Sequence, residues 1–97
     1  MSTMKNKYDL SDFVPVLTEQ KVLSNLTKRI KERRKEAKLT QKGLSLKSGV
    51  SYASIRRFER TGEISLRSLL RIADALDALA DFETLFSNEI IGDLKDY

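Results

Sequence analysis

The sequence has no cysteine, no histidine and no tryptophan, and only one proline and four glycines among its 97 residues. Without cysteine it forms no disulfide, and without histidine it lacks the zinc sites and catalytic triads that depend on imidazole. Its apolar runs are short, far below the ~20 residues that a membrane-spanning helix needs, and the first residues lack the apolar segment of a signal peptide. We therefore expect a cytoplasmic protein that is not an enzyme and that uses no cofactor or metal ion.

The remaining composition is typical of one small globular domain. Hydrophobic residues make up 40% of the chain and charged residues 33%, a balance unlike that of disordered or fibrous sequences. Hydrophobic residues recur every three or four positions, which predicts helices at residues 20–37, 41–48, 52–60, 66–76 and 81–86. The predicted fold is all-α, with an N-terminal arm at residues 1–22, a helical domain at residues 23–87 and a C-terminal extension at residues 88–97.

Residue types at the ends of these segments support the predicted helix limits. Thr40, Ser51 and Ser65 are N-cap types, and Gly49 suits the left-handed backbone that ends many helices. The apolar side chains that we expect to be buried are Val22, Leu23, Leu26, Ile30 and Ala37 in the first helix, Leu44 in the second, Ile55 and Phe58 in the third, Leu66, Leu69, Leu70, Ile72, Ala73 and Leu76 in the fourth, and Phe82, Leu85 and Phe86 in the last.

Charge is unevenly distributed along the chain. Residues 28–71 contain fourteen basic and four acidic side chains, whereas residues 77–97 contain six acidic side chains and one lysine. A basic body attracts a polyanion through its summed field and through the release of counterions. A charge run by itself is more often a solvated helix face. The basic segment therefore indicates nucleic-acid binding only if an element that fits a groove of DNA lies beside it.

Residues 40–60 have the outline of a helix-turn-helix, because two short helices are joined by a tight glycine turn. Gly49 supplies the positive φ of the turn. Ser45 provides a small side chain where the helices cross, and its hydroxyl is expected to bond back to the preceding turn. The second helix leaves one face free, and a helix of that width enters the major groove of DNA. The side chains on this face are Tyr52, Ala53, Arg56, Arg57 and Arg60.

The segment 39–60 resembles the lambda-repressor-like (Xre/Cro) helix-turn-helix family of bacterial and phage regulators. The residues that carry the resemblance are Thr40-Gln41, Gly49-Val50-Ser51, Ile55 and Glu59, followed by Ser65-Leu66, Leu69, Ile72-Ala73 and Leu76. The resemblance extends over about residues 26–86 and implies a five-helix domain that binds double-stranded DNA. Gly43 departs from the family pattern, because the family usually has an acidic, helix-favouring residue there.

The resemblance also implies roles for individual side chains. Base-reading positions are matched or adjoined by Tyr52, Ala53, Arg56 and Arg57, and phosphate-contacting positions by Gln41, Ser51, Ser54, Arg60 and Arg67. Arg34 and Glu59 match a buried ion pair that ties the first helix to the third. Plainer alternatives stay open: Arg56 and Arg57 as phosphate contacts, Tyr52 as a partly buried residue near the turn, and Ser51 as a helix cap.

Two functions follow as hypotheses. The first is a sequence-specific transcriptional regulator, a repressor that reads the major groove as a homodimer, with residues 13–17 and 90–97 as candidate dimer surfaces. The second is an antitoxin-like module that neutralises a partner toxin and autoregulates its own operon. The stretch 58–65 resembles antitoxins of kinase-type toxin–antitoxin pairs, and DNA binding is common to both hypotheses.

Overall fold

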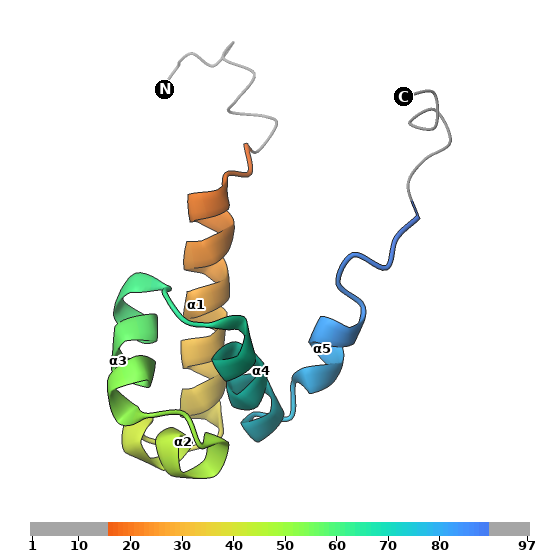
Figure 1. Ribbon diagram of the computed structural model, residues 1–97. Coiled ribbons are helices and arrows are strands. Elements are labelled where there is room, and N and C mark those ends of the chain that lie inside the picture. Colours follow the sequence, from red (N-terminus) through yellow and green to blue (C-terminus); the bar gives the residue numbers. More distant parts are fainter. Residues whose placement is uncertain (1–15, 90–97) are drawn as a thin grey trace.

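The computed structural model describes residues 16–89, which form five helices and no strand. The helices are α1 (Glu19–Glu36), α2 (Gln41–Ser48), α3 (Tyr52–Thr61), α4 (Leu66–Ala75) and α5 (Leu79–Glu83). The predicted all-α, five-helix fold is therefore confirmed. Figure 1 shows α1 as a long upright helix with α2 across its lower end, α3 on one side, and α4 and then α5 on the other.

Four of the five helices begin at a residue whose hydroxyl accepts a backbone N–H of the first turn. These N-caps are Thr18, Thr40, Ser51 and Ser65, with N···O distances of 2.9–3.1 Å. Each cap satisfies one N–H group that has no partner within the helix, which stabilises the helix by about 1 kcal/mol. The predicted starts of α2, α3 and α4 are correct for this reason.

The last helix was predicted at the wrong residues. α5 covers Leu79–Glu83, two residues earlier than the predicted 81–86, and Phe86 lies beyond it with a left-handed backbone (φ 61°). Ala78 precedes α5 and offers no side-chain cap, so the sequence carries no local signal for its start. Asp77, with φ of 57°, separates α4 from α5.

The hydrophobic core lies between α2, α3 and α4. Its buried members are Leu44, Val50, Ile55, Ile72, Ala75 and Leu76, and Ile30, Leu39 and Ile64 pack against it. Phe58, which is 2% exposed, is buried on the same face of α3 as Ile55. Complete burial of such a side chain contributes about 1.5–3 kcal/mol, so these residues fix the orientation of α3.

Several residues that were expected to be buried are exposed. Val22 is 48% exposed and Leu66 is 67% exposed, and Ala37 is the exposed C-cap of α1. On α1, the buried side chains are Thr27 and Arg34 instead. α1 packs against α3 and α5 packs against α4, which leaves Val22, near the start of α1, largely exposed.

At the other end of the domain, Leu85 (57% exposed) and Phe86 (fully exposed) also lack the cover that was expected. Val16 and Leu17, the described part of the predicted dimer segment 13–17, are exposed ahead of α1. The remainder of that segment and residues 90–97 lie outside the described residues. The division into arm, domain and extension stays a prediction.

Candidate nucleic-acid interface

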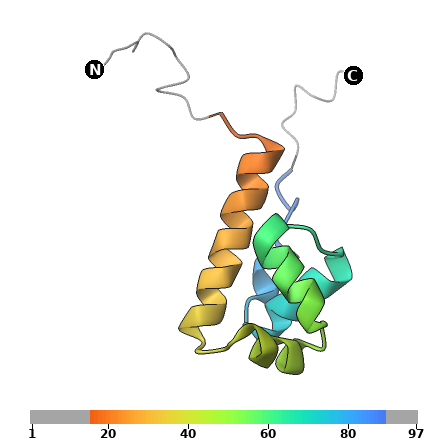
Figure 2. The same ribbon diagram turned by 90° about the vertical axis from the view of Figure 1, so that its left-hand side faces the viewer.

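The outer face of α3 is open to solvent. Ile55 and Phe58 anchor one side of the helix in the core, which turns Tyr52, Ala53, Arg56, Arg57 and Arg60 outward. In Figure 2, which looks onto α3, this helix lies in front of the domain with α2 below it. The structure thus brings all four predicted base-reading side chains to one exposed helix face.

The turn between α2 and α3 is held by its own hydrogen bonds. Gly49 has φ of 78°, and its N–H donates to the carbonyl oxygen of Ser45 at 2.9 Å. The hydroxyl of Ser45 donates forward to the carbonyl oxygen of Val50 at 2.6 Å, so the predicted bond to the preceding turn is wrong. The Val50 N–H in turn donates to the hydroxyl of Ser48 at 3.1 Å. These bonds clamp the turn from both sides and fix how α3 leaves α2.

A buried ion pair joins α1 to α3. Arg34 Nε lies 2.7 Å from Glu59 Oε2 and Arg34 Nη2 lies 3.0 Å from Oε1, with the two side chains 9% and 4% exposed. Arg34 Nη1 also donates to the carbonyl oxygen of Leu39 at 2.7 Å. Two parallel N–H···O bonds are the strongest arrangement for this pair, so the ion pair fixes α1 to the C-terminal part of α3.

Gln41, the first residue of α2, belongs to the same cluster. Its Nε2 donates to Glu59 Oε1 at 2.9 Å, so one carboxylate receives side chains from two other helices. Burial alone raises the pKa of Glu59, but hydrogen bonds from Arg34 and Gln41 and the nearby positive charges of Arg34 and Lys31 outweigh it. The pKa of Glu59 therefore lies below its ordinary value, and this carboxyl is ionised at neutral pH.

Ser51 and Ser54, both predicted as phosphate contacts, are joined to each other at the start of α3. The hydroxyl of Ser51 accepts the Ser54 N–H at 3.1 Å and donates to the Ser54 hydroxyl at 2.8 Å. Ser51 is thus a helix cap, the plainer of its two predicted roles. The two remaining predicted phosphate contacts, Arg60 and Arg67, are exposed on α3 and at the start of α4.

Tyr52 is 37% exposed and lies between two cations. Lys42 Nζ is 5.4 Å and Arg56 Cζ is 5.5 Å from the centre of its ring, distances at which cation–π attraction operates. The ring therefore links the first turn of α2 to α3 in one basic surface. Sequence reasoning missed Lys42, although its position next to Gln41 at the start of α2 was a usable signal.

Glu63 is the second residue that sequence reasoning missed. Its Oε1 lies 2.5 Å from Arg57 Nη2, and both side chains are more than 60% exposed. Four residues, 62–65, connect α3 to α4, and Glu63 is one of them. Arg57 and Glu63 are six residues apart in the sequence, and only pairs three or four residues apart can be predicted from helix periodicity.

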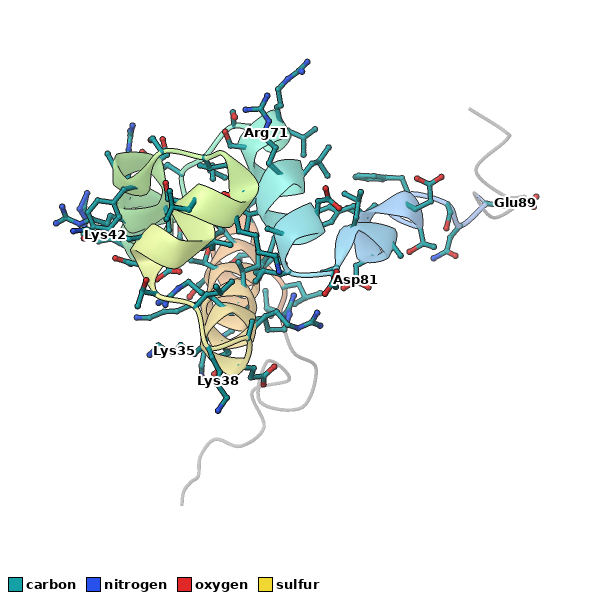
Figure 3. All side chains as sticks on the ribbon, turned by 90° about the horizontal axis from the view of Figure 1, so that it is seen from below. Lys35, Lys38, Lys42, Arg71, Asp81 and Glu89 are labelled. Carbon is teal, nitrogen blue, oxygen red and sulfur yellow. The ribbon has the colours of Figure 1, made fainter. Side chains whose placement is uncertain are left out.

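Some of the charged side chains of the described residues lie on opposite sides of the molecule. Figure 3 shows Lys35, Lys38 and Lys42 on the side of α1 and α2, and Asp81 and Glu89 on the opposite side, along α5 and the segment after it. A basic side next to an outward-facing helix is the combination that attracts a nucleic acid and presents a reading element to it.

These features define a helix-turn-helix protein, because two short helices, α2 and α3, are joined by a tight turn at Gly49 and the second of them carries an exposed basic face. A family model described as helix-turn-helix matches residues 30–81, more than half of the chain. The chain therefore belongs to the lambda-repressor-like (Xre) helix-turn-helix family, whose members are DNA-binding transcription regulators, typically without enzymatic activity. No curated protein and no solved structure gives a significant match to it. Among residues 16–89, no helix has the length and apolar character that would allow it to cross a membrane.

Proposed function

We propose that the protein is a sequence-specific repressor that inserts α3 into the major groove of double-stranded DNA in the cytoplasm. The observation that carries the proposal is the outward face of α3, which no other described element covers. The buried Arg34–Glu59 pair and the α2–α3 turn fix this helix relative to the domain. A pre-organised helix loses little conformational freedom on binding, which favours affinity.

Within the groove, Arg57 is the proposed reader of guanine, because a guanidinium donates two parallel hydrogen bonds to guanine O6 and N7. Tyr52 and Ala53 lie one turn earlier on α3, where they reach thymine methyl groups. Arg56 reaches either a base edge or the groove wall. The proposed phosphate contacts are Gln41, Ser51, Ser54, Arg60 and Arg67. Helix N-termini favour anions through free N–H groups, which supports the contacts at the starts of α2, α3 and α4.

Selection of bound sequences from random duplexes at about 150 mM salt, a concentration at which non-specific binding is weak, tests this function. We expect an enriched, pseudo-palindromic site whose half-sites lie about 34 Å apart, because a dimer places two reading helices one helical turn apart. The affinity for that site should fall steeply with salt. Equal binding to all duplexes, or binding that salt does not change, would contradict the proposal.

A homodimer is part of the same proposal, and an apolar groove supports it. The groove has a volume of ≈ 540 Å³ and lies between α1, α4 and α5, with Leu26 and Phe82 in its walls and Val22, Leu85 and Phe86 at its edges. Exposed apolar surface of this kind marks interaction sites. We infer that a second copy of the chain covers it.

Charge complementarity favours a second copy as the occupant. Arg29 and Arg33 lie on the α1 wall of the groove and Asp81 lies on the α5 wall, with Glu83 at the end of α5. In a two-fold dimer the same surface is used by both copies, so the basic wall of each can face the acidic wall of the other. The face is self-complementary in this sense.

Phe86→Asn tests the dimer, because asparagine tolerates the positive φ at this position and removes the apolar ring. We expect sedimentation to show a dimer for the wild type and a monomer for this variant. Leu46→Asn is the matched control, since Leu46 is 88% exposed on α2, outside the groove, and should leave the dimer intact. A monomeric wild type contradicts the dimer.

The groove also favours a second candidate function, an antitoxin-like module in which a partner toxin fills it. In that case the chain is monomeric alone, and a stoichiometric partner is recovered with it from a native lysate. Phe86→Asn then abolishes that recovery while Leu46→Asn does not. A chain that is dimeric alone and recovers no partner contradicts this function.

A further inference from the structure

The ion pair between Arg57 and Glu63 is not explained by fold stability. Both side chains are more than 60% exposed, and ion pairs in such surroundings contribute little to stability. Yet the pair engages the side chain that is proposed to read guanine. Glu63 also brings a negative charge to the edge of the surface that faces a polyanion.

The backbone around Glu63 is held in place. Thr61 Oγ1 accepts the Glu63 N–H at 3.1 Å and donates to the carbonyl oxygen of Arg57 at 2.7 Å. Gly62 ends α3 with φ of 81°, and Leu23 of α1 occupies the space next to it, so that an added Cβ would lie 2.9 Å from Leu23 Cγ. The loop backbone is therefore held on two sides, and it places Glu63 within ion-pair distance of Arg57.

We propose that Glu63 is a specificity-determining residue that reserves Arg57 for a base edge and keeps it from phosphate. The proposal rests on the DNA-binding function given above. A guanidinium has five N–H donors, and Glu63 occupies one side of it, at Nη2. The remaining donors suffice for the two bonds to guanine.

The non-specific attraction of an arginine to phosphate, by contrast, depends on its net positive charge. The Arg57–Glu63 pair is neutral as a unit, and the carboxylate repels phosphate oxygens that approach the guanidinium. Because phosphate contacts supply nearly all of non-specific affinity and base contacts supply discrimination, Glu63 weakens binding to arbitrary DNA more than binding to the correct site.

Glu63→Gln tests the proposal, because glutamine keeps the size of the side chain and removes its charge. Two probes are compared across a salt series: the duplex enriched by selection, and a shuffled duplex of the same length and composition. Freed Arg57 gains about one phosphate contact, so affinity for the shuffled duplex should rise about eightfold at ~0.1 M salt, and its log–log salt slope should steepen by ~0.9. Affinity for the enriched duplex should stay unchanged, so the ratio of the two affinities falls about eightfold.

Two controls separate this effect from a general change of charge. Glu83→Gln makes the same charge change on α5, on the other side of the molecule from α3, and should leave the affinity ratio unchanged. In the Arg57→Ala background, Glu63→Gln should also leave the ratio unchanged, because the partner is gone.

An unchanged ratio in Glu63→Gln, with wild-type discrimination intact, overturns the role of Glu63 alone. A change of ratio that persists without Arg57 overturns it as well. A wild type that does not discriminate between the duplexes overturns the proposed function, and this inference with it.

Discussion

Removing Arg34 should destabilise the domain severely. Arg34→Met keeps the bulk of the side chain but leaves the Glu59 carboxylate, which is 4% exposed, without its ion-pair partner. Only the hydrogen bond from Gln41 remains. Loss of one partner of a buried pair costs about 3–5 kcal/mol, a large part of the ~5–15 kcal/mol by which natural domains are stable.

Urea unfolding followed by far-UV circular dichroism measures the effect. The double variant Arg34→Met/Glu59→Met should recover most of the lost stability, because apolar residues of similar size often replace a buried ion pair at little cost. Lys35→Met is the matched control on the exposed side of α1, and should change the free energy of unfolding by less than about 0.5 kcal/mol. A cost below about 1 kcal/mol for Arg34→Met would refute the reasoning, because the pair would then behave as a surface pair.

Three further outcomes follow from the same structure. The pKa of Glu59 lies below its ordinary value of 4.5, so the stability that the ionised carboxylate contributes is present above pH 4.5 and is lost as the pH falls through the folded pKa. The difference in stability between the wild type and Glu59→Gln, measured by urea unfolding, should therefore shrink below pH 4.5. Gly62→Ala should lower the stability of the domain in thermal unfolding more than Gly49→Ala does. Both substitutions add about 1–2 kcal/mol of left-handed strain, but an added Cβ at Gly62 lies 2.9 Å from Leu23, whereas nothing lies within 4 Å of one at Gly49. Equal losses of stability would contradict the clash. Arg60→Ala should weaken binding to enriched and shuffled duplexes by the same factor and lower the salt slope by about one, as expected for a phosphate contact; a loss confined to the enriched duplex would make Arg60 a base reader.

Local signals account for most of the fold that could be predicted. Thr40, Ser51 and Ser65 are caps whose effect depends on residues two or three positions away, so the sequence alone locates the starts of α2, α3 and α4. α5 has no such cap, and its hydrophobic spacing is compatible with a start at either residue 79 or residue 81. Periodicity therefore predicted that the helix exists but not where it begins.

Burial was harder to predict than helix position. Val22 and Leu66 have the correct spacing for a buried stripe, yet both are exposed. Spacing shows which residues share a face, whereas burial also requires a neighbouring element to cover that face. α5 packs mainly against α4, and no pattern in the sequence specifies that choice.

The candidate site divides in the same way. The outward face of α3 could be predicted, because Ile55 and Phe58 determine by periodicity which side is turned to solvent. The partners of its polar side chains could not. Gln41 and Glu59 are 18 residues apart, and their bond depends on how α2 crosses α3. The exposed pair of Arg57 with Glu63 depends on a loop conformation that only the folded backbone defines.

The position of Glu59 connects the stability of the domain to its surface. Its carboxylate receives Arg34 from α1 and Gln41 from the first turn of α2, so one group fixes the approach of α2 to α3 and holds a side chain proposed to contact phosphate. An apolar pair at positions 34 and 59 would fill the same space but would offer no hydrogen-bond acceptor to orient the side chain of Gln41. Stability and DNA affinity should therefore separate in Arg34→Met/Glu59→Met, which would fold well and bind the enriched duplex more weakly than the wild type. Equal affinity in that variant would mean that packing alone orients α2, and that the ion pair serves only to neutralise its own buried charge.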